Sequence, residues 1–330
     1  MDQDAVTAVV ARYGRFAREE APGRSRVYEE WARRVETDPD VAEVLARIPD
    51  THRQPPLVFA VLRLLGAPMD ADDAWAAWIV AHADVIVAEC GRRALQTNEP
   101  LRCAALLPAL SLIEGPIALI EIGASAGLCL YPDRYSYRFR TPGGVVRSLD
   151  PSDGPSPVIL ESDLEGDPSL RLPDVVWRAG IDLQPLDARD EGDRAWLTGL
   201  VWPGEEGRRE RITAALDIAA ADPPLLLAGD GAAALPDLVA RAPRDATIVV
   251  TTPGVLVHVP RRHRGDIIAA ARTAGRWVTL DAAGLHEAWA TAPELRPGGF
   301  ALALDGAVLA SVDPLGAWVA WHPGSAYRAQ

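Results

Sequence analysis

The residues in this sequence that could do chemistry together are a carboxylate, Glu121, and the five small residues at 123–127. Residues 117–122 read IALIEI and are followed by GASAG. Small side chains let a ligand approach the backbone closely, and an adjacent carboxylate favours a cation. Three partners suit such a loop: a dinucleotide, a nucleoside cofactor without phosphates, or a substrate attacked by Ser125.

Two known motifs overlap in residues 123–127. The dinucleotide motif G-x-G-x-x-G fits poorly, because Ser125 replaces the glycine that admits a pyrophosphate and no strand-ending acid follows about twenty residues later. The motif G-x-S-x-G is the nucleophile elbow of α/β-hydrolases. The other triad members would then be Asp281 or Asp305, and His286 or His322. Against a hydrolase, this strand is the first in its sheet and no HGGG-like segment precedes it.

The third interpretation is a site for S-adenosylmethionine. This cofactor carries an ammonium, a sulfonium and a carboxylate, but no phosphate. Glu121 suits the cations, and exposed N–H groups of the loop suit the carboxylate. We therefore expect the cofactor to lie against Glu121 and the loop residues Gly123, Ala124, Ser125 and Gly127. A tight strand-to-helix turn without any ligand is the alternative.

Polar residues after later strands extend this expected site. Asp182, in AGIDL, could accept hydrogen bonds from ribose hydroxyls. Asp230, after LLLAG, could meet the adenine amino group or cap the helix that follows. Thr251 is expected to contact the cofactor as well. His258 is the candidate catalytic residue, because a neutral imidazole near pH 7 can remove a proton from a methyl acceptor.

Four segments of the chain resemble a bacterial family known as domain of unknown function 2332. They are LQTNEPLRCAALLPAL (95–110), EIGASAGLCL (121–130), WRAGIDLQPLD (177–187) and AGDGAAALPDL (228–238). The resemblance covers nearly the whole chain and, through the glycine loop, implies a class I methyltransferase-like domain of Rossmann type. It implies no particular reaction. It does make Asn98, Glu99 and Arg102 candidate substrate-binding residues, although a helix cap also explains them.

The chain departs from the pattern of this family near the expected cleft. Cys129 stands where asparagine is usual, and Thr252 and His258 replace other polar types. Such changes imply either a shifted substrate or a lost activity. Thr252, together with Tyr131 and Arg134 shortly after the loop, could contact the substrate; packing and surface pairing explain the last two equally well.

Residues 1–115 carry helical patterns, and we expect them to form an N-terminal all-helical domain that acts as a cap, packing surface or lid. Apolar residues recur at spacings of three and four. Pro39 and Pro56 suit first helical turns, and Gly66 suits a helix end. The segments with this pattern are 4–20, 24–37, 39–48, 56–65, 74–95 and 101–113.

Residues 116–330 alternate strand and helix patterns, which predicts an α/β domain with a Rossmann-like, mostly parallel sheet. The expected strands are 117–122, 135–140, 158–161, 175–183, 225–228, 246–251, 277–280, 300–304 and 308–312. The expected helices are 194–201, 208–221, 232–242 and 262–274. The turn Asp305-Gly306 predicts that the sheet ends in an antiparallel hairpin. We expect residues 141–157, rich in Pro, Gly, Ser and Asp, to be a loop.

Composition excludes several classes of function. The formal charge of −13 over 330 residues opposes binding to nucleic acid or to anionic membranes. All 33 basic side chains are arginine, so a Schiff-base lysine, a pyridoxal phosphate anchor and a P-loop lysine are absent. The three cysteines lack CxxC spacing and histidine is scarce, which argues against a metal site.

The remaining expectations concern location and partners. The acidic start MDQDAVTAVV does not resemble a signal peptide, and no apolar stretch approaches the roughly 18 residues of a membrane span. We therefore expect a cytoplasmic transferase that acts on a small molecule. The apolar helical domain makes a homodimer plausible.

Overall fold

The computed structural model describes residues 3–285 and 295–322, and the chain divides into two compact units. Unit 1 comprises residues 1–97 and 190–213, and unit 2 comprises residues 98–189 and 214–330. The chain first passes from unit 1 to unit 2 after Thr97, which is upstream of the domain boundary expected at residue 115. The return of the chain to unit 1 at residues 190–213 has no counterpart in the sequence-based expectation.

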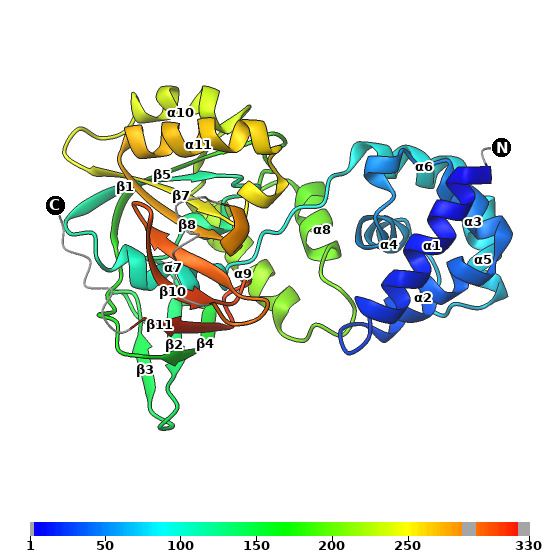
Figure 1. The fold of residues 1–330 in the computed structure, drawn as a ribbon, viewed down its shortest axis with the longest axis horizontal. Helices are drawn as coiled ribbons and strands as arrows, with labels where there is room; N and C mark the ends of the chain where they lie inside the picture. Colours follow the sequence, from blue (N-terminus) through cyan, green and yellow to red (C-terminus); the bar gives the residue numbers. More distant parts are fainter. Residues whose placement is uncertain (1–2, 286–294, 323–330) are drawn as a thin grey trace. The chain divides into compact units, whose positions relative to one another are not determined.

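Unit 1 is helical (Figure 1). Its helices are α1 (Gln3–Glu19), α2 (Arg26–Thr37), α3 (Pro39–Ala46), α4 (Pro55–Leu64), α5 (Asp73–Ala81), α6 (Ala83–Arg92) and α8 (Glu191–Gly199), with a 3₁₀ turn η1 (Asp50–His52). Side chains cap four of them: Ser25 accepts from the third residue of α2, Asp38 from two N–H groups of α3, Asp72 from α5, and Asp190 from α8. These caps explain why short helices begin where they do.

The single helix expected at 74–95 is two helices, α5 and α6, which meet at 73°. His82 lies between them with φ −108° and ψ 16°, outside the helical region. Its ring contacts the Trp78 carbonyl oxygen at 2.7 Å and stacks on the Trp78 indole. Apart from this bent pair, which together would be long enough, the described residues contain no helix long and apolar enough to cross a membrane.

The core of unit 1 is a cluster of aromatic rings packed against one another. The ring of Tyr28 lies 5.8 Å from Trp31, 5.1 Å from Phe59 and 5.5 Å from Trp202 between centroids. Trp202 comes from the returning segment. Arg63 also holds this segment, because its guanidinium donates to the carbonyl oxygens of residues 199 and 201. Residues 190–213 are therefore an integral part of the helical unit.

Unit 2 is built on one mixed, mostly parallel sheet, as expected for an α/β fold. Its strands are β1 (Pro116–Ile122), β2 (Ser136–Arg140), β3 (Val146–Leu149), β4 (Ile159–Glu165), β5 (Asp174–Asp182), β6 (Leu225–Ala228), β7 (Thr247–Pro253), β8 (Arg276–Asp281), β9 (Phe300–Leu304), β10 (Ala307–Val312) and β11 (Trp318–Trp321). Among the described residues their order is β3-β2-β4-β11-β10-β9-β8-β7-β1-β5-β6.

Five consecutive strands of this sheet, β6-β5-β1-β7-β8, are parallel. The chain builds outward from β1 in one direction through β5 and β6, and then in the other direction through β7 and β8. β1 is therefore central, and the order reverses between β1 and β7. Its burial on both faces accounts for the continuous apolar run of residues 117–120.

The hairpin expected at Asp305-Gly306 is present and joins β9 to β10; both turn residues have positive φ. It does not end the sheet, however. β11 pairs antiparallel with β10 and parallel with β4, so the insertion β2-β3-β4 continues the same sheet. Neither β3 nor β11 was predicted, and β3 lies inside the segment expected to be a loop. Both have four residues, and β3 is an edge strand with alternating exposed side chains, so hydrophobic periodicity detects neither.

The remaining elements of this unit are α7 (Arg102–Leu110), α9 (Arg208–Ala221, which begins in the returning segment), α10 (Gly231–Val239), α11 (Arg261–Ala274), and the 3₁₀ turns η2 (Leu128–Leu130), η3 (Leu256–His258) and η4 (Ala283–Leu285). Figure 1 shows α10 and α11 together on one side of the sheet. Leu235 and Ile267 from these helices pack against Ile120 and Ile181 of the sheet. This core holds β1 and β5, and therefore the ends of both strands, in place.

Close packing between β5 and the residue after β1 gives the first testable prediction. A Cβ on Gly180 would lie 2.4 Å from Ala124 Cβ and 2.9 Å from Leu226 Cδ2. Gly180→Ala should therefore destabilise unit 2 by about 1–3 kcal/mol, as overpacked core substitutions do. The measurement is the free energy of unfolding in urea, followed by circular dichroism.

Gly265→Ala is the matched control in the same unit. Gly265 lies in α11, and nothing within 4 Å would meet its added Cβ. Alanine is the better helix former, so this change should stabilise the unit by about 0.5–1 kcal/mol. Equal effects of the two substitutions would contradict the close approach of β5 to Ala124.

Candidate functional site

The polar residues expected at the cofactor site gather at the carboxyl ends of the central parallel strands. Glu121 lies near the end of β1, Asp182 ends β5, and Thr251 and Thr252 lie near the end of β7. Glu121 is level with Thr251 across one neighbour and with Gly180 across the other. In open parallel sheets, ligands bind outside the carboxyl ends where the strand order reverses. Here that place lies between β1 and β7.

Glu121 is the most unusual side chain at this edge. It is 3 % exposed, and its Oε2 atom is buried without a hydrogen-bond partner among the described residues. Burial raises the pKa of its carboxyl well above the usual 4.5; the nearby Cys129 and Asp182 raise it further, and Arg102 opposes the shift. An unpartnered buried carboxyl costs free energy, so this arrangement suits a cationic partner or a bound proton.

The glycine loop turns sharply after β1, with positive φ at Gly123 (80°), Ser125 (51°) and Gly127 (74°). Its N–H groups bind the neighbouring strand. Gly123 and Ala124 both donate to the Ile181 carbonyl oxygen, at 2.8 and 3.1 Å, and Ser125 donates to Asp182 Oδ2 at 2.8 Å. These three donors, which we expected to bind a cofactor carboxylate, are used within the protein.

The loop is also covered by apolar side chains. A Cβ on Gly123 would lie 2.4 Å from Val255 Cγ2, so the Val255 methyl group occupies the space above this glycine. Gly127 is covered in the same way by Leu130 and Pro224, each 3.0 Å from such a Cβ. Ser125 is only 4 % exposed. A ligand that touches the backbone at Gly123 must therefore displace Val255.

Val255 is a site residue that sequence reasoning missed. It carries no chemical signal of its own. The clue in the sequence was its position two residues after the end of β7, in TTPGV, where a turn at Gly254 returns the chain toward β1.

Asp182 and Asp230 lie at the ends of successive strands and each already accepts hydrogen bonds. Asp182 accepts from the N–H groups of Ser125 and Gln184 and is half-buried. A carboxylate offers about four acceptor positions, so Asp182 can accept two more. Asp230 caps α10, because Oδ1 accepts from the N–H groups of Ala232 and Ala233, both at 3.0 Å. The cap that we considered for Asp230 is thus present.

Thr251 and Thr252 are buried in the sheet. The Thr251 hydroxyl donates to the Ile120 carbonyl oxygen at 3.4 Å. Thr252 Oγ1 accepts from Trp277 Nε1 and donates to Thr279, which in turn donates to Asp281 Oδ2 at 2.5 Å. Thr252 is therefore part of a buried hydrogen-bond chain between β7 and β8.

Asn98, Glu99 and Arg102 lie against the glycine loop. Asn98 Oδ1 accepts from the Leu128 N–H at 3.2 Å, and its Nδ2 atom is buried without a hydrogen-bond partner among the described residues. Glu99, 1 % exposed, accepts from the Leu101 N–H. Arg102 donates to the carbonyl oxygens of Pro253 and Pro314. Asn98 therefore lies at the end of the glycine loop, and Arg102 lies close enough to Glu121 to act on its carboxyl electrostatically.

His258 and Cys129 complete the surroundings of Arg102. Partial burial and the positive charge of Arg102 lower the pKa of His258, so its ring is neutral at pH 7. Cys129 is buried, and its thiol donates to the Glu99 carbonyl oxygen at 3.5 Å. A hydrogen bond with Cys103, together with burial, raises the pKa of the Cys129 thiol, which makes it a packing residue rather than a nucleophile.

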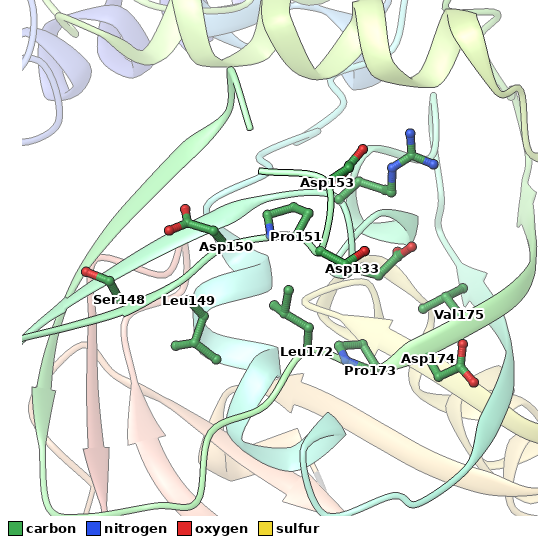
Figure 2. A pocket seen from close by; sticks show the side chains of 12 residues that line it. Asp133, Ser148, Leu149, Asp150, Pro151, Asp153, Leu172, Pro173, Asp174 and Val175 are labelled. Atoms are coloured by element: carbon green, nitrogen blue, oxygen red, sulfur yellow. The ribbon is translucent and has the colours of Figure 1, made fainter. Parts of the chain in front are cut away.

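Tyr131 and Arg134 do not join this group. Tyr131 is fully buried, donates to the Asp222 carbonyl oxygen at 2.7 Å and lies under the Arg178 guanidinium. Arg134 lines a hollow of about 810 Å³ beside the amino end of β5. Figure 2 shows that Asp133, Asp150 and Asp153 line this hollow, together with Asp174 at the start of β5. Asp174 and Asp182 are eight residues apart along β5, or about 26 Å in an extended strand.

The two acids of the hydrolase alternative already have hydrogen-bond partners in the sheet. The positive φ of Ser125 suits a nucleophile elbow. However, the Asp305 carboxylate accepts hydrogen bonds from Arg276 and from the Trp277 N–H. The Asp281 carboxylate accepts one from the Thr279 hydroxyl. His286 lies outside the described residues. No group of three or more His, Cys, Asp or Glu side chains suitable for a metal ion occurs within residues 3–285 and 295–322.

The raised pKa of Glu121 predicts an unusual dependence of stability on pH. A folded-state pKa above the unfolded value means that stability falls as pH rises from about 4.5 to the raised pKa, because only the unfolded chain releases the proton there. Glu121→Gln removes this loss. The variant should be more stable than the original protein at pH 7.5, and the difference should shrink toward pH 4. Thermal unfolding across this range measures it.

Asp150→Asn in the same unit should show the opposite trend. The Ser136 hydroxyl and then Arg138 hold the pKa of Asp150 below its usual 3.8, so its contribution to stability is present at neutral pH and disappears in acid. The variant should be slightly less stable at pH 7.5. A Glu121→Gln variant that is destabilised at every pH would show that Glu121 is ionised and satisfied in the folded protein.

The model of a protein family described as "Uncharacterized protein conserved in bacteria (DUF2332)" matches residues 10–321, and the chain belongs to this family. No curated protein and no solved structure matches the chain.

Proposed function

We propose that this DUF2332 family member binds S-adenosylmethionine at the carboxyl ends of β1, β5 and β7, and transfers its methyl group to a small molecule. One observation carries the proposal: Glu121 is a buried carboxyl whose Oε2 atom has no hydrogen-bond partner among the described residues, next to a glycine loop, where the strand order reverses. That is the place where an open parallel sheet binds ligands, and the carboxyl suits a cation.

The strand order supports a Rossmann-like arrangement. Numbered along the chain, the five parallel strands β6-β5-β1-β7-β8 run third, second, first, fourth and fifth, the order of doubly wound nucleotide-binding sheets. Glu121 and Asp182 then lie at the ends of the first and second strands, and Asp230 comes just after the third. Three carboxylates in this succession suit the cations, the ribose hydroxyls and the adenine amino group.

The residues fit some parts of the cofactor better than others. Glu121 Oε2 has no partner among the described residues and Asp182 has acceptor positions to spare. The loop N–H groups at Gly123, Ala124 and Ser125 are already used, so they do not provide the carboxylate site expected from the sequence. The fit therefore depends on Glu121 and on side chains outside the loop.

The bound cofactor would supply an electrophilic methyl group, and the protein would mainly position the acceptor. His258 can accept a proton at a ring nitrogen, because its lowered pKa keeps the ring neutral at pH 7. Arg102, anchored by two carbonyl oxygens, disfavours a charged imidazole beside it. A proton taken from the acceptor would therefore pass readily from His258 to solvent.

A second candidate function is a noncatalytic protein with a degenerate cofactor pocket. The position of Val255 over Gly123 and the occupied N–H groups of the loop favour it. Such a protein would bind S-adenosylmethionine without transferring its methyl group.

Calorimetry with S-adenosylmethionine tests the proposal directly. A cation next to Glu121 favours the ionised carboxylate, so binding at pH 7 should release a proton. The measured heat should then differ between phosphate and Tris buffers. Glu121→Gln should weaken binding by about 1.5–3 kcal/mol, the scale of hydrogen bonds to charged groups, and remove the buffer dependence. Asp150→Asn, far along the sheet, should change neither quantity. No heat with millimolar ligand would end the proposal.

Val255→Ala tests whether Val255 blocks a cofactor site above Gly123 or whether no cofactor site exists there. Removing the two methyl groups opens the space above Gly123. If cofactor must displace Val255, this variant should bind S-adenosylmethionine several-fold more tightly than the original protein. Leu256→Ala, a neighbouring buried residue of the same turn, is the control and should only reduce stability. Unchanged affinity in Val255→Ala would place the ligand elsewhere.

Labelling with a fluorophosphonate probe tests the hydrolase alternative. Ser125 is nearly inaccessible, with its N–H bound to Asp182, so we expect no labelling that Ser125→Ala abolishes. Labelling that depends on Ser125 would favour the hydrolase over the methyltransferase.

A further inference from the structure

We propose that Asn98 and Arg102 bind the carboxylate of the cofactor's amino-acid group while Glu121 binds its ammonium, so that the site selects ligands carrying a zwitterionic α-amino acid. This inference rests on the proposed function and deepens it. It moves Asn98 and Arg102 from the substrate, where the sequence placed them, to the cofactor.

Two buried polar atoms that have no hydrogen-bond partner within residues 3–285 and 295–322 carry the inference. Glu121 Oε2 is an acceptor when ionised, and Asn98 Nδ2 is a donor. Their residues are 3 % and 6 % exposed. Buried polar groups are normally hydrogen-bonded, and each exception calls for a missing partner. A single ligand group that presents both a donor and an acceptor can satisfy both atoms.

Both atoms belong to residues that bracket the glycine loop. Glu121 precedes the loop on β1, and Asn98 is fixed to its other end through the Leu128 N–H. The two sides are joined by Cys129, which donates to the Glu99 carbonyl oxygen and also influences the carboxyl of Glu121 electrostatically. Glu121 and Asn98 therefore flank one short turn of the chain.

The charges have the polarity that a zwitterion needs. Arg102 is held in place by the carbonyl oxygens of Pro253 and Pro314, and its positive charge acts on Glu121 and His258. A carboxylate is stabilised beside Arg102 and Asn98 Nδ2, and an ammonium beside Glu121. Because the loop N–H groups already donate to β5, the carboxylate of the ligand would be bound by these side chains instead.

The experiment compares S-adenosylmethionine with its decarboxylated form, which keeps the ammonium and the sulfonium but lacks the carboxylate. Affinities are measured by calorimetry on the full chain. The original protein should bind S-adenosylmethionine at least tenfold more tightly. Asn98→Asp keeps an acceptor for the Leu128 N–H but replaces the donor with a negative charge, so it should abolish or reverse this preference.

Gln184→Glu is the matched control, because it adds the same charge at an exposed position beside Asp182. It should affect both ligands equally. Equal affinity of the original protein for the two ligands would overturn the inference while leaving the proposed function intact. Binding of neither would overturn both. Because the comparison in the original protein needs no variant, a folding defect in Asn98→Asp leaves the test decisive.

Discussion

The burial of one carboxyl group, Glu121, is the constraint around which unit 2 is arranged. Glu121 lies on the central strand of a parallel sheet, so its carboxyl loses its hydration, which costs free energy. It lies near the carboxyl end of β1, where the chain leaves the sheet. The loop that follows is made of residues small enough to pack against β5. Arg102, Cys129 and Asp182 set the electrostatic environment of the carboxyl. The remainder of the sheet holds these elements in register.

Much of this arrangement was predictable from the sequence because it depends on local patterns. The apolar run before Glu121 and the Asp305-Gly306 turn indicate a buried strand and a hairpin, and both are present. The continuation of the sheet through β11 was not predictable, because a four-residue strand becomes ordered only by pairing with partners distant in sequence. At the bend, the His82 ring contacts both the carbonyl oxygen and the indole of Trp78, and hydrophobic periodicity cannot register such contacts.

The candidate site, like the fold, was predictable where it depends on local patterns and not where it depends on tertiary contacts. The sequence identifies which polar residues follow the strands, but not how their hydrogen bonds are used. Thr252 and Asp230 both carry suitable groups, yet one joins a buried chain to β8 and the other caps α10. Val255 has no chemical signal at all, although it determines access to Gly123. Residue type limits what a site can do, and tertiary contacts decide which of its groups remain available to a ligand.

The return of the chain to unit 1 affects how this protein can be dissected. Because Trp202 completes the aromatic core around Tyr28, the helical unit is not encoded by one continuous stretch. A fragment that starts at Asn98 would carry residues 190–213 without the helices that cover them, leaving an indole and other apolar side chains in water. Conversely, residues 1–97 alone would lack part of their own interior. Neither unit can therefore be exchanged between proteins by a simple end-to-end fusion.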